Sequence, residues 1–213
     1  MGIVLGREEY ITYFERVQKK LEEEKDYITE LDAATGDGDH WANMYAGFQK
    51  LTQSAGELKE ENLSGLFRKS GMILMSGIGG SSGVLYGGAY MSASKVLEGK
   101  EKIDLHIWLE ILKAMLEDIM KRGGAAPGHK TMLDALAPAV NILEKSLAEG
   151  KEEPEILNGV KKAAQEGAEA TRQMSAVFGR AVYQADKGVG HLDPGAVTMM
   201  YQISILADMF LEK

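Results

Sequence analysis

The chain has no cysteine among its 213 residues, which excludes disulfides and thiolate-bound metals. Basic residues are few: 24 lysines and arginines stand against 32 acidic residues, so a broad surface for nucleic acid or anionic membrane is not expected. No apolar run approaches the ~20 residues of a membrane span, and no signal peptide is visible at the N-terminus. These absences fit a protein of the reducing cytoplasm, and they leave room for a small anion bound through metal.

The chain also lacks strict alternation of β-branched residues, so a sheet has little support. Apolar residues recur instead with the period of amphipathic helices. About eight helices are expected, at roughly residues 8–29, 41–51, 63–75, 84–97, 104–120, 131–147, 153–174 and 196–211. Asp104 is predicted to be an N-cap, and Pro154 falls near a helix start, where its missing N–H costs least. Without a linker or repeat, residues 1–213 are expected to form one all-α domain.

Glycine is abundant, with 25 residues, and many of them fall between the expected helices. Four stretches carry them: residues 36–38, 77–88, 123–128 and 188–195. Loops at one end of a helical bundle can converge on a single site. Because glycine has no Cβ, such loops can bring backbone close to a ligand.

The first of these stretches belongs to the sequence DAATGDGDHWAN, residues 32–43. Its carboxylates, Asp32, Asp37 and Asp39, repel one another unless a cation lies between them. Carboxylate oxygens suit Mg²⁺ or Ca²⁺, but the spacing does not fit an EF-hand loop. The sequence therefore indicates a metal site, with a solvated acidic turn and helix cap as the alternative.

The second stretch, GIGGSSGVLYGG at residues 77–88, permits two interpretations. Successive backbone N–H groups at a helix start, together with Ser81 and Ser82, could bind phosphate. A tight helix crossing packed on small residues would need the same glycines. A Walker A loop is excluded because no Gly-Lys-Ser/Thr closes the stretch.

Two further motifs, residues 122–134 and 179–196, each end a loop and open a helix. Asp193 before Pro194 predicts a capped helix start, which does not exclude ligand contact. The four histidines fit no zinc spacing, and no nucleophile elbow is present. Handling of nucleotide phosphates through metal is the chemistry that these motifs favour.

Taken in order, the four motifs resemble the L subunit, or L domain, of dihydroxyacetone kinases over residues 27–209. Each motif alone is weakly specific, whereas four in this order are strongly so. The related domain of fatty-acid kinases carries Asp-Gly-Asp-Thr where this chain has Asp-Gly-Asp-His at residues 37–40. The resemblance therefore lies on the dihydroxyacetone kinase side.

The resemblance implies a barrel of about eight antiparallel helices with ADP or ATP in the loops at one end. It implies two Mg²⁺ ions on Asp32, Asp37 and Asp39, and no catalytic side chain, because bound nucleotide carries the phosphoryl group. The nucleotide-binding residues it implies are His40, Trp41, Ala42, Asn43, Ser81 and Ser82 for the phosphates, and Gly123, Thr131, Met132, Arg180, Asp193, Pro194 and Gly195 for adenine and ribose.

The resemblance also implies two partners, as in the phosphoenolpyruvate-dependent system. An M-type phosphotransferase subunit would rephosphorylate the bound ADP, and a K-type subunit would hold dihydroxyacetone as the acceptor. Two alternatives stay open: a subunit of an ATP-dependent kinase for another small keto-sugar or polyol, and a nucleotide-loaded regulatory partner of a transcription factor.

Three positions depart from the family pattern. His129 stands where an acidic residue is usual, Trp41 where glycine is usual, and residues 185–188 replace the usual Gly-Glu-Arg-Ser. All three are expected to face nucleotide or partner, so they bear on the acceptor and the donor rather than on the metal ligands. Trp41 and residues 185–188 are candidates for the surface around the nucleotide site on which a partner subunit would dock.

Overall fold

The computed structural model describes residues 2–213, and within this range the chain is helical, with one isolated β-bridge between Leu5 and Ile103. The all-α prediction is confirmed. The α-helices are α1 (Arg7–Glu23), α2 (Lys25–Thr35), α3 (His40–Gln53), α4 (Ala55–Leu58), α5 (Leu63–Gly77), α6 (Gly80–Val96), α7 (Leu105–Gly123), α8 (Leu133–Ala148), α9 (Glu153–Ala170) and α10 (Pro194–Leu211); two short 3₁₀ helices are η1 (Thr171–Gln173) and η2 (Arg180–Tyr183).

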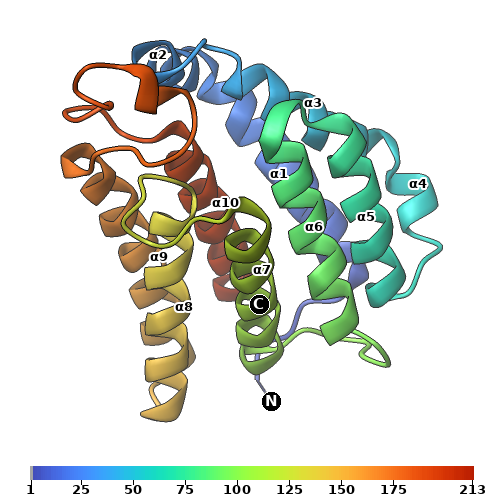
Figure 1. Cartoon of the computed structure of the whole chain (residues 1–213). Coiled ribbons are helices and arrows are strands. Elements are labelled where there is room, and N and C mark those ends of the chain that lie inside the picture. The colour runs from blue at the N-terminus through green and yellow to red at the C-terminus, as the bar shows by residue number, and fades with distance from the viewer. Residues whose placement is uncertain (1) are drawn as a thin grey trace.

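The long helices pack in a ring (Figure 1). Helix α1 packs on α3, α3 on α5, α5 on α6, α6 on α7, and α7 on α8. Helix α8 contacts both α9 and α10, and α10 returns to α1. In Figure 1 the N-terminus lies at the lower end and the C-terminus in the lower half, whereas the long loop between α9 and α10 lies at the upper end. The loop between α9 and α10 therefore lies on the side of the ring away from the termini.

Several helix boundaries differ from the sequence prediction. The first predicted helix is two helices that meet at Glu24, and the second of them runs on to Thr35. Asp32 therefore lies on a helix rather than in a loop. Helix α6 begins at Gly80, four residues before the predicted start, and α9 ends at Ala170 before passing into η1.

The predicted helix caps are confirmed. Asp104 Oδ1 accepts the backbone N–H of Ile107 at 2.8 Å, and Asp193 Oδ2 accepts that of Ala196 at 2.7 Å. Pro154 lies in the first turn of α9. These caps satisfy backbone donors that a helix start would otherwise leave without a partner.

The glycines of α6 explain how closely it approaches α5. A Cβ on Gly87 would lie 2.7 Å from the backbone oxygen of Gly71, and a Cβ on Gly71 would lie 2.7 Å from that of Gly87. The two backbones therefore touch, and neither position has space for a side chain. The packing interpretation of residues 77–88 holds for the part of the stretch inside α6.

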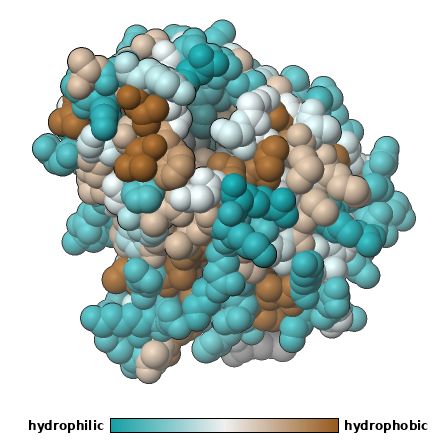
Figure 2. Space-filling model, in the orientation of Figure 1, coloured by the Kyte–Doolittle hydropathy of each residue, from teal (hydrophilic) through white to brown (hydrophobic). Residues whose placement is uncertain are grey.

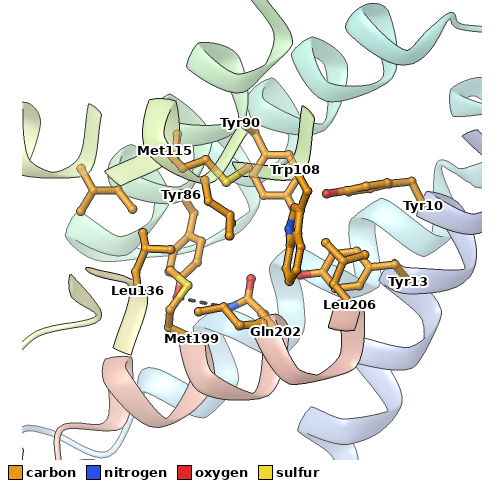
Figure 3. Close-up of a pocket in the computed structure, with 14 residues that line it drawn as sticks. Tyr10, Tyr13, Tyr86, Tyr90, Trp108, Met115, Leu136, Met199, Gln202 and Leu206 are labelled. Carbon is orange, nitrogen blue, oxygen red and sulfur yellow. Dashed lines mark hydrogen bonds between the residues drawn. The ribbon is translucent and has the colours of Figure 1, made fainter. Parts of the chain in front are cut away.

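The interior of the ring is lined by aromatic residues around a small cavity of about 40 Å³ (Figure 3). Tyr86 and Trp108 face it and are buried, and burial raises the pKa of Tyr86 to about 12. The Trp108 Nε1–H has no hydrogen-bond partner among the described residues. None of the helices between residues 2 and 213 combines the length and apolar character that a bilayer-spanning helix requires.

Candidate nucleotide and metal site

A large cavity of about 680 Å³ lies at the loop end of the ring. Its walls include the first residues of α3, α6 and α10, the last residues of α7, and the segment just before α8. Residues 172–190, which we call the lid loop, contribute Phe178, Gly179, Arg180 and Ala181. Figure 2 shows this end hollowed between two lobes of the surface. The volume suits a ligand of nucleotide size.

Three carboxylates meet at one edge of the cavity. Asp32 projects from the last turn of α2 and is buried, whereas Asp37 and Asp39 lie on the following turn and are exposed. One oxygen from each lies within 4.8 Å of the other two. A Cβ on Gly36 would lie 2.5 Å from Asp32 Oδ1, and Gly38 has φ +76°, so both glycines are needed for this turn. The glycines therefore serve the carboxylate cluster directly.

The donor set of this cluster fits a hard divalent cation. Oxygen ligands from carboxylates suit Mg²⁺, which commonly takes one or two of them and completes its shell with water and phosphate. Arg180 of the lid loop already places a positive charge there, with Nη2 2.7 Å from Asp37 Oδ2. The cluster therefore attracts positive charge, as its ion pair with Arg180 shows.

Helix N-termini face the same cavity. The first residues of α3, α6 and α10 line it, and α8 begins directly after Thr131 and Met132, which line it too. Free backbone N–H groups and the positive end of the helix dipole make such positions favourable for anions. At α6 the donors are joined by Ser81 and Ser82, and Asn43 of α3 lies against Gly79 beside them. The anion-binding interpretation of residues 77–88 therefore fits the turn between α5 and α6.

His40 is held as a neutral ring. Its backbone N–H donates to Asp32 Oδ2 at 2.9 Å, and its Nε2 lies 3.0 Å from Thr198 Oγ1. Burial lowers the pKa of His40, although the charges of Asp32 and Asp39 act in the opposite direction. His40 therefore links the carboxylate cluster on α2 to α10 by hydrogen bonds rather than by charge.

Two further acidic residues, Asp134 and Asp193, make structural contacts at the cavity. Asp134 accepts the backbone N–H of Thr131 at 2.7 Å and that of Gly128, which fixes the turn before α8. Burial raises the pKa of Asp193 to about 7. Both residues shape the cavity wall, and Asp193 also lines it.

Most residues named from the sequence line this one cavity. They are Asp32, Asp37, Asp39, His40, Asn43, Ser81, Ser82, Gly123, Thr131, Met132, Arg180, Asp193, Pro194 and Gly195. Trp41 and Ala42 are not among its lining residues. Trp41 turns away: its Nε1 donates to the backbone oxygen of Leu21 at 2.7 Å, and its ring stacks on Tyr45 at 5.2 Å.

Sequence reasoning missed several lining residues, of which three carry distinctive chemistry: Arg122, Lys130 and Phe178. Arg122 Nε is 2.6 Å from Asp118 Oδ2, which orients its guanidinium at the mouth of the cavity. Arg122 and Lys130 both lie inside the third sequence motif, so a basic residue within a glycine-bearing motif was the available signal. Phe178 lies in no glycine motif, and nothing in the local sequence indicates it.

Comparison with known proteins places this geometry in a family. The DAK2 domain matches residues 34–208. The ADP-binding subunit DhaL of the PEP-dependent dihydroxyacetone kinase of Escherichia coli is 30% identical, over 95% of this chain and 97% of that protein. The corresponding subunit of kinase 1 of Listeria innocua is 36% identical, over 84% of each chain.

A solved structure agrees. The dihydroxyacetone kinase of C. freundii, in complex with AMP-PNP and Mg²⁺, superimposes with a TM-score of 0.72 at 31% identity. The match covers 93% of this chain and 33% of that kinase, so the similarity is to about one third of that longer protein. On these matches, the chain belongs to the DAK2-domain family, with the ADP-binding subunits of PEP-dependent dihydroxyacetone kinases among its relatives.

Proposed function

We propose that this chain is the nucleotide-binding subunit of a dihydroxyacetone kinase, holding ADP and two Mg²⁺ ions. It would relay a phosphoryl group from an M-type phosphotransferase subunit to dihydroxyacetone on a K-type subunit. The observation that carries the proposal is the meeting of three carboxylates and several helix N-termini on one cavity of nucleotide size.

Each part of the cavity has a task in this function. Asp32, Asp37 and Asp39 would hold the metal ions, and the first turns of α3 and α6 would bind the phosphates. Bound Mg²⁺ would neutralise phosphate charge, which together with positioning is most of what phosphoryl transfer requires. The apolar side chains of Val84, Leu85 and Phe178 offer the remaining surface to the base.

The acceptor has no evident site on this chain. The two cavity-lining side chains that could add to a ketone are already engaged: Lys130 Nζ donates to the backbone oxygens of Thr171 and His191, and His40 Nε2 is hydrogen-bonded to Thr198. A small polar acceptor needs several directed hydrogen bonds to be aligned for attack. A K-type partner would supply them, and the lid loop offers it exposed apolar side chains at Val177 and Tyr183.

Reconstitution tests the relay. Purified chain is mixed with dihydroxyacetone and either ATP or a phosphorylated M-type subunit, with and without the K-type subunit. We expect sugar phosphate only when the K-type subunit is present and the M-type subunit donates. Product without the K-type subunit would contradict the partner requirement, and equal turnover with ATP would favour the ATP-dependent alternative.

Native mass spectrometry tests the cofactor. We expect the purified chain to carry the mass of one ADP and two Mg²⁺ ions, because tightly held nucleotide is what a relay needs. A chain that exchanges ATP rapidly and retains no ADP would support an ATP-dependent kinase instead. A chain that binds neither nucleotide would contradict the proposal.

A further inference from the structure

Lys130 is a lysine in an unusual setting. Only 3% of its surface is exposed, although it is charged. Its backbone has φ +60°, a left-handed conformation that is rare for a residue with a side chain. Burial lowers the pKa of its ammonium, while nearby Asp193 raises it. Strained, desolvated positions persist where the surrounding structure requires them, and they cluster at functional sites.

The ammonium of Lys130 joins the two ends of the lid loop. Its Nζ donates to the backbone oxygen of Thr171 at 2.6 Å and to that of His191. These two residues flank the loop directly, on its N-terminal and C-terminal sides. Beside them, the Gly190 N–H donates to the Arg172 oxygen at 2.8 Å and closes the base of the loop. Lys130 therefore ties both ends of the loop to the cavity wall.

The lid loop rests on Lys130 and reaches the metal cluster beyond it. A Cβ on Gly188 would lie 3.2 Å from Lys130 Cε, so the loop packs directly on the lysine stem. From the loop, Gln184 Nε2 donates to the Ala34 oxygen on α2 at 2.8 Å, and Arg180 pairs with Asp37. A shift at the base of the loop would displace both contacts.

We propose that Lys130 is a positioning residue: its ammonium fixes the base of the lid loop, which holds Arg180 beside the metal-binding carboxylates and keeps the cavity covered over bound nucleotide. The expected effect on nucleotide release rests on the proposed function, whereas the expected effect on the loop does not. The charge of Lys130, rather than the size of its side chain, should fix the loop, because two carbonyl oxygens accept hydrogen bonds from the ammonium.

The first test is Lys130→Met, which keeps most of the length of the side chain and removes its charge. Release of a fluorescent ADP analogue from the Mg²⁺-loaded chain should accelerate by about tenfold or more, because the two backbone oxygens at the base of the loop lose their charged donor. Hydrogen exchange should rise at the amides of Ala176 and Gly190, whose partners lie within the loop. Lys187→Met, an exposed lysine on the same loop, is the matched control and should change neither.

The second test restores the charge chemically. Because the chain has no cysteine, Lys130→Cys carries a single thiol. Alkylation with 2-bromoethylamine in denaturant, followed by refolding, forms a C–S bond, expels bromide and leaves an ammonium at nearly the reach of lysine. Alkylation with 2-bromoethanol gives the neutral counterpart. We expect the ammonium form to release ADP within about threefold of wild type and the hydroxyl form to release it as fast as Lys130→Met.

These outcomes separate the inference from the proposed function. Equal ADP release and equal loop exchange in wild type and Lys130→Met would overturn the role of Lys130. Equal behaviour of the two alkylated forms would do the same, even if Lys130→Met failed to fold. If wild type bound no nucleotide, the proposed function would fail, while loop exchange would still decide whether Lys130 fixes the loop.

Discussion

Replacing Asp37 with alanine should abolish binding of Mg·ADP while leaving the fold intact. Asp37 is exposed on a turn, and Arg180 is its ion-pair partner in the described chain. A pair this exposed contributes at most about 1 kcal/mol to stability. Removing one of three mutually repelling carboxylates should also reduce the repulsion in the folded protein when no metal is bound. Asp32 would be a poorer choice, because it is buried and accepts the backbone N–H of His40 at the start of α3.

The size of the effect follows from ligand linkage. A ligand present at 100 times its Kd stabilises the folded state by about 2.7 kcal/mol. For a chain of this length, each kcal/mol shifts the melting temperature by about 2–4 °C, so wild type should gain roughly 5–11 °C with Mg·ADP. Asp37→Ala should gain almost nothing. Without ligand, the two proteins should melt within about 2–4 °C of each other, since the ion pair is weak.

The assay is thermal unfolding followed by circular dichroism, with and without Mg·ADP. Glu30→Ala is the matched control, because Glu30 is an exposed carboxylate two residues from Asp32 on the same helix. It should show the full ligand shift. An equal shift in Asp37→Ala and wild type would remove Asp37 from the site and refute the reasoning from carboxylate geometry.

Further predictions concern the fold and its pH dependence. Gly87→Ala should destabilise the chain by about 1–3 kcal/mol in urea unfolding, because its Cβ would strike the backbone of α5; Gly56→Ala, which meets nothing within 4 Å, should be neutral or slightly stabilising. Asp104→Ala should cost about 1 kcal/mol through the lost cap of α7, read in the same assay. In the folded chain the pKa of Asp193 rises from 3.8 to about 7, so its contribution to stability is complete at low pH and is lost as pH rises through 7. Wild type should therefore lose stability relative to Asp193→Asn between about pH 4 and pH 8; a difference that stays constant over this range would contradict a buried carboxyl.

The helix pattern could be read from the sequence because most helices bury one apolar face in the ring. The break at Glu24 could not, because residues 22–26 are all charged and leave no apolar period to interrupt. The start of α6 was missed for a different reason. Glycines and serines at residues 79–83 have low helix propensity, but a Cβ on Gly83 would strike the backbone oxygen of Ile78, so close packing there requires glycine and outweighs that preference.

The site shows the same limit at the level of single residues. The resemblance assigned residues 40–43 to the nucleotide as a block, yet the structure turns only His40 and Asn43 toward the cavity. In a helix, residues three apart share a face, whereas those one and two further on point elsewhere. Trp41 accordingly packs against α1. Lys130 escaped attention because its importance lies in carbonyl groups more than 40 residues later in the chain.

Two metal ions, as proposed above, would balance the charges at the carboxylate cluster better than one ion would. The three aspartates carry three negative charges, and Arg180 offsets one of them. A nucleoside diphosphate would add about three more negative charges near neutral pH. One Mg²⁺ would leave an excess of about three negative charges within a few ångströms, which like-charge repulsion makes costly. A second ion reduces that excess to about one, which the helix N-termini can accommodate through their partial positive charge. Arg180 sits on the lid loop, so a loop that covered bound nucleotide would bring with it part of the positive charge in this balance.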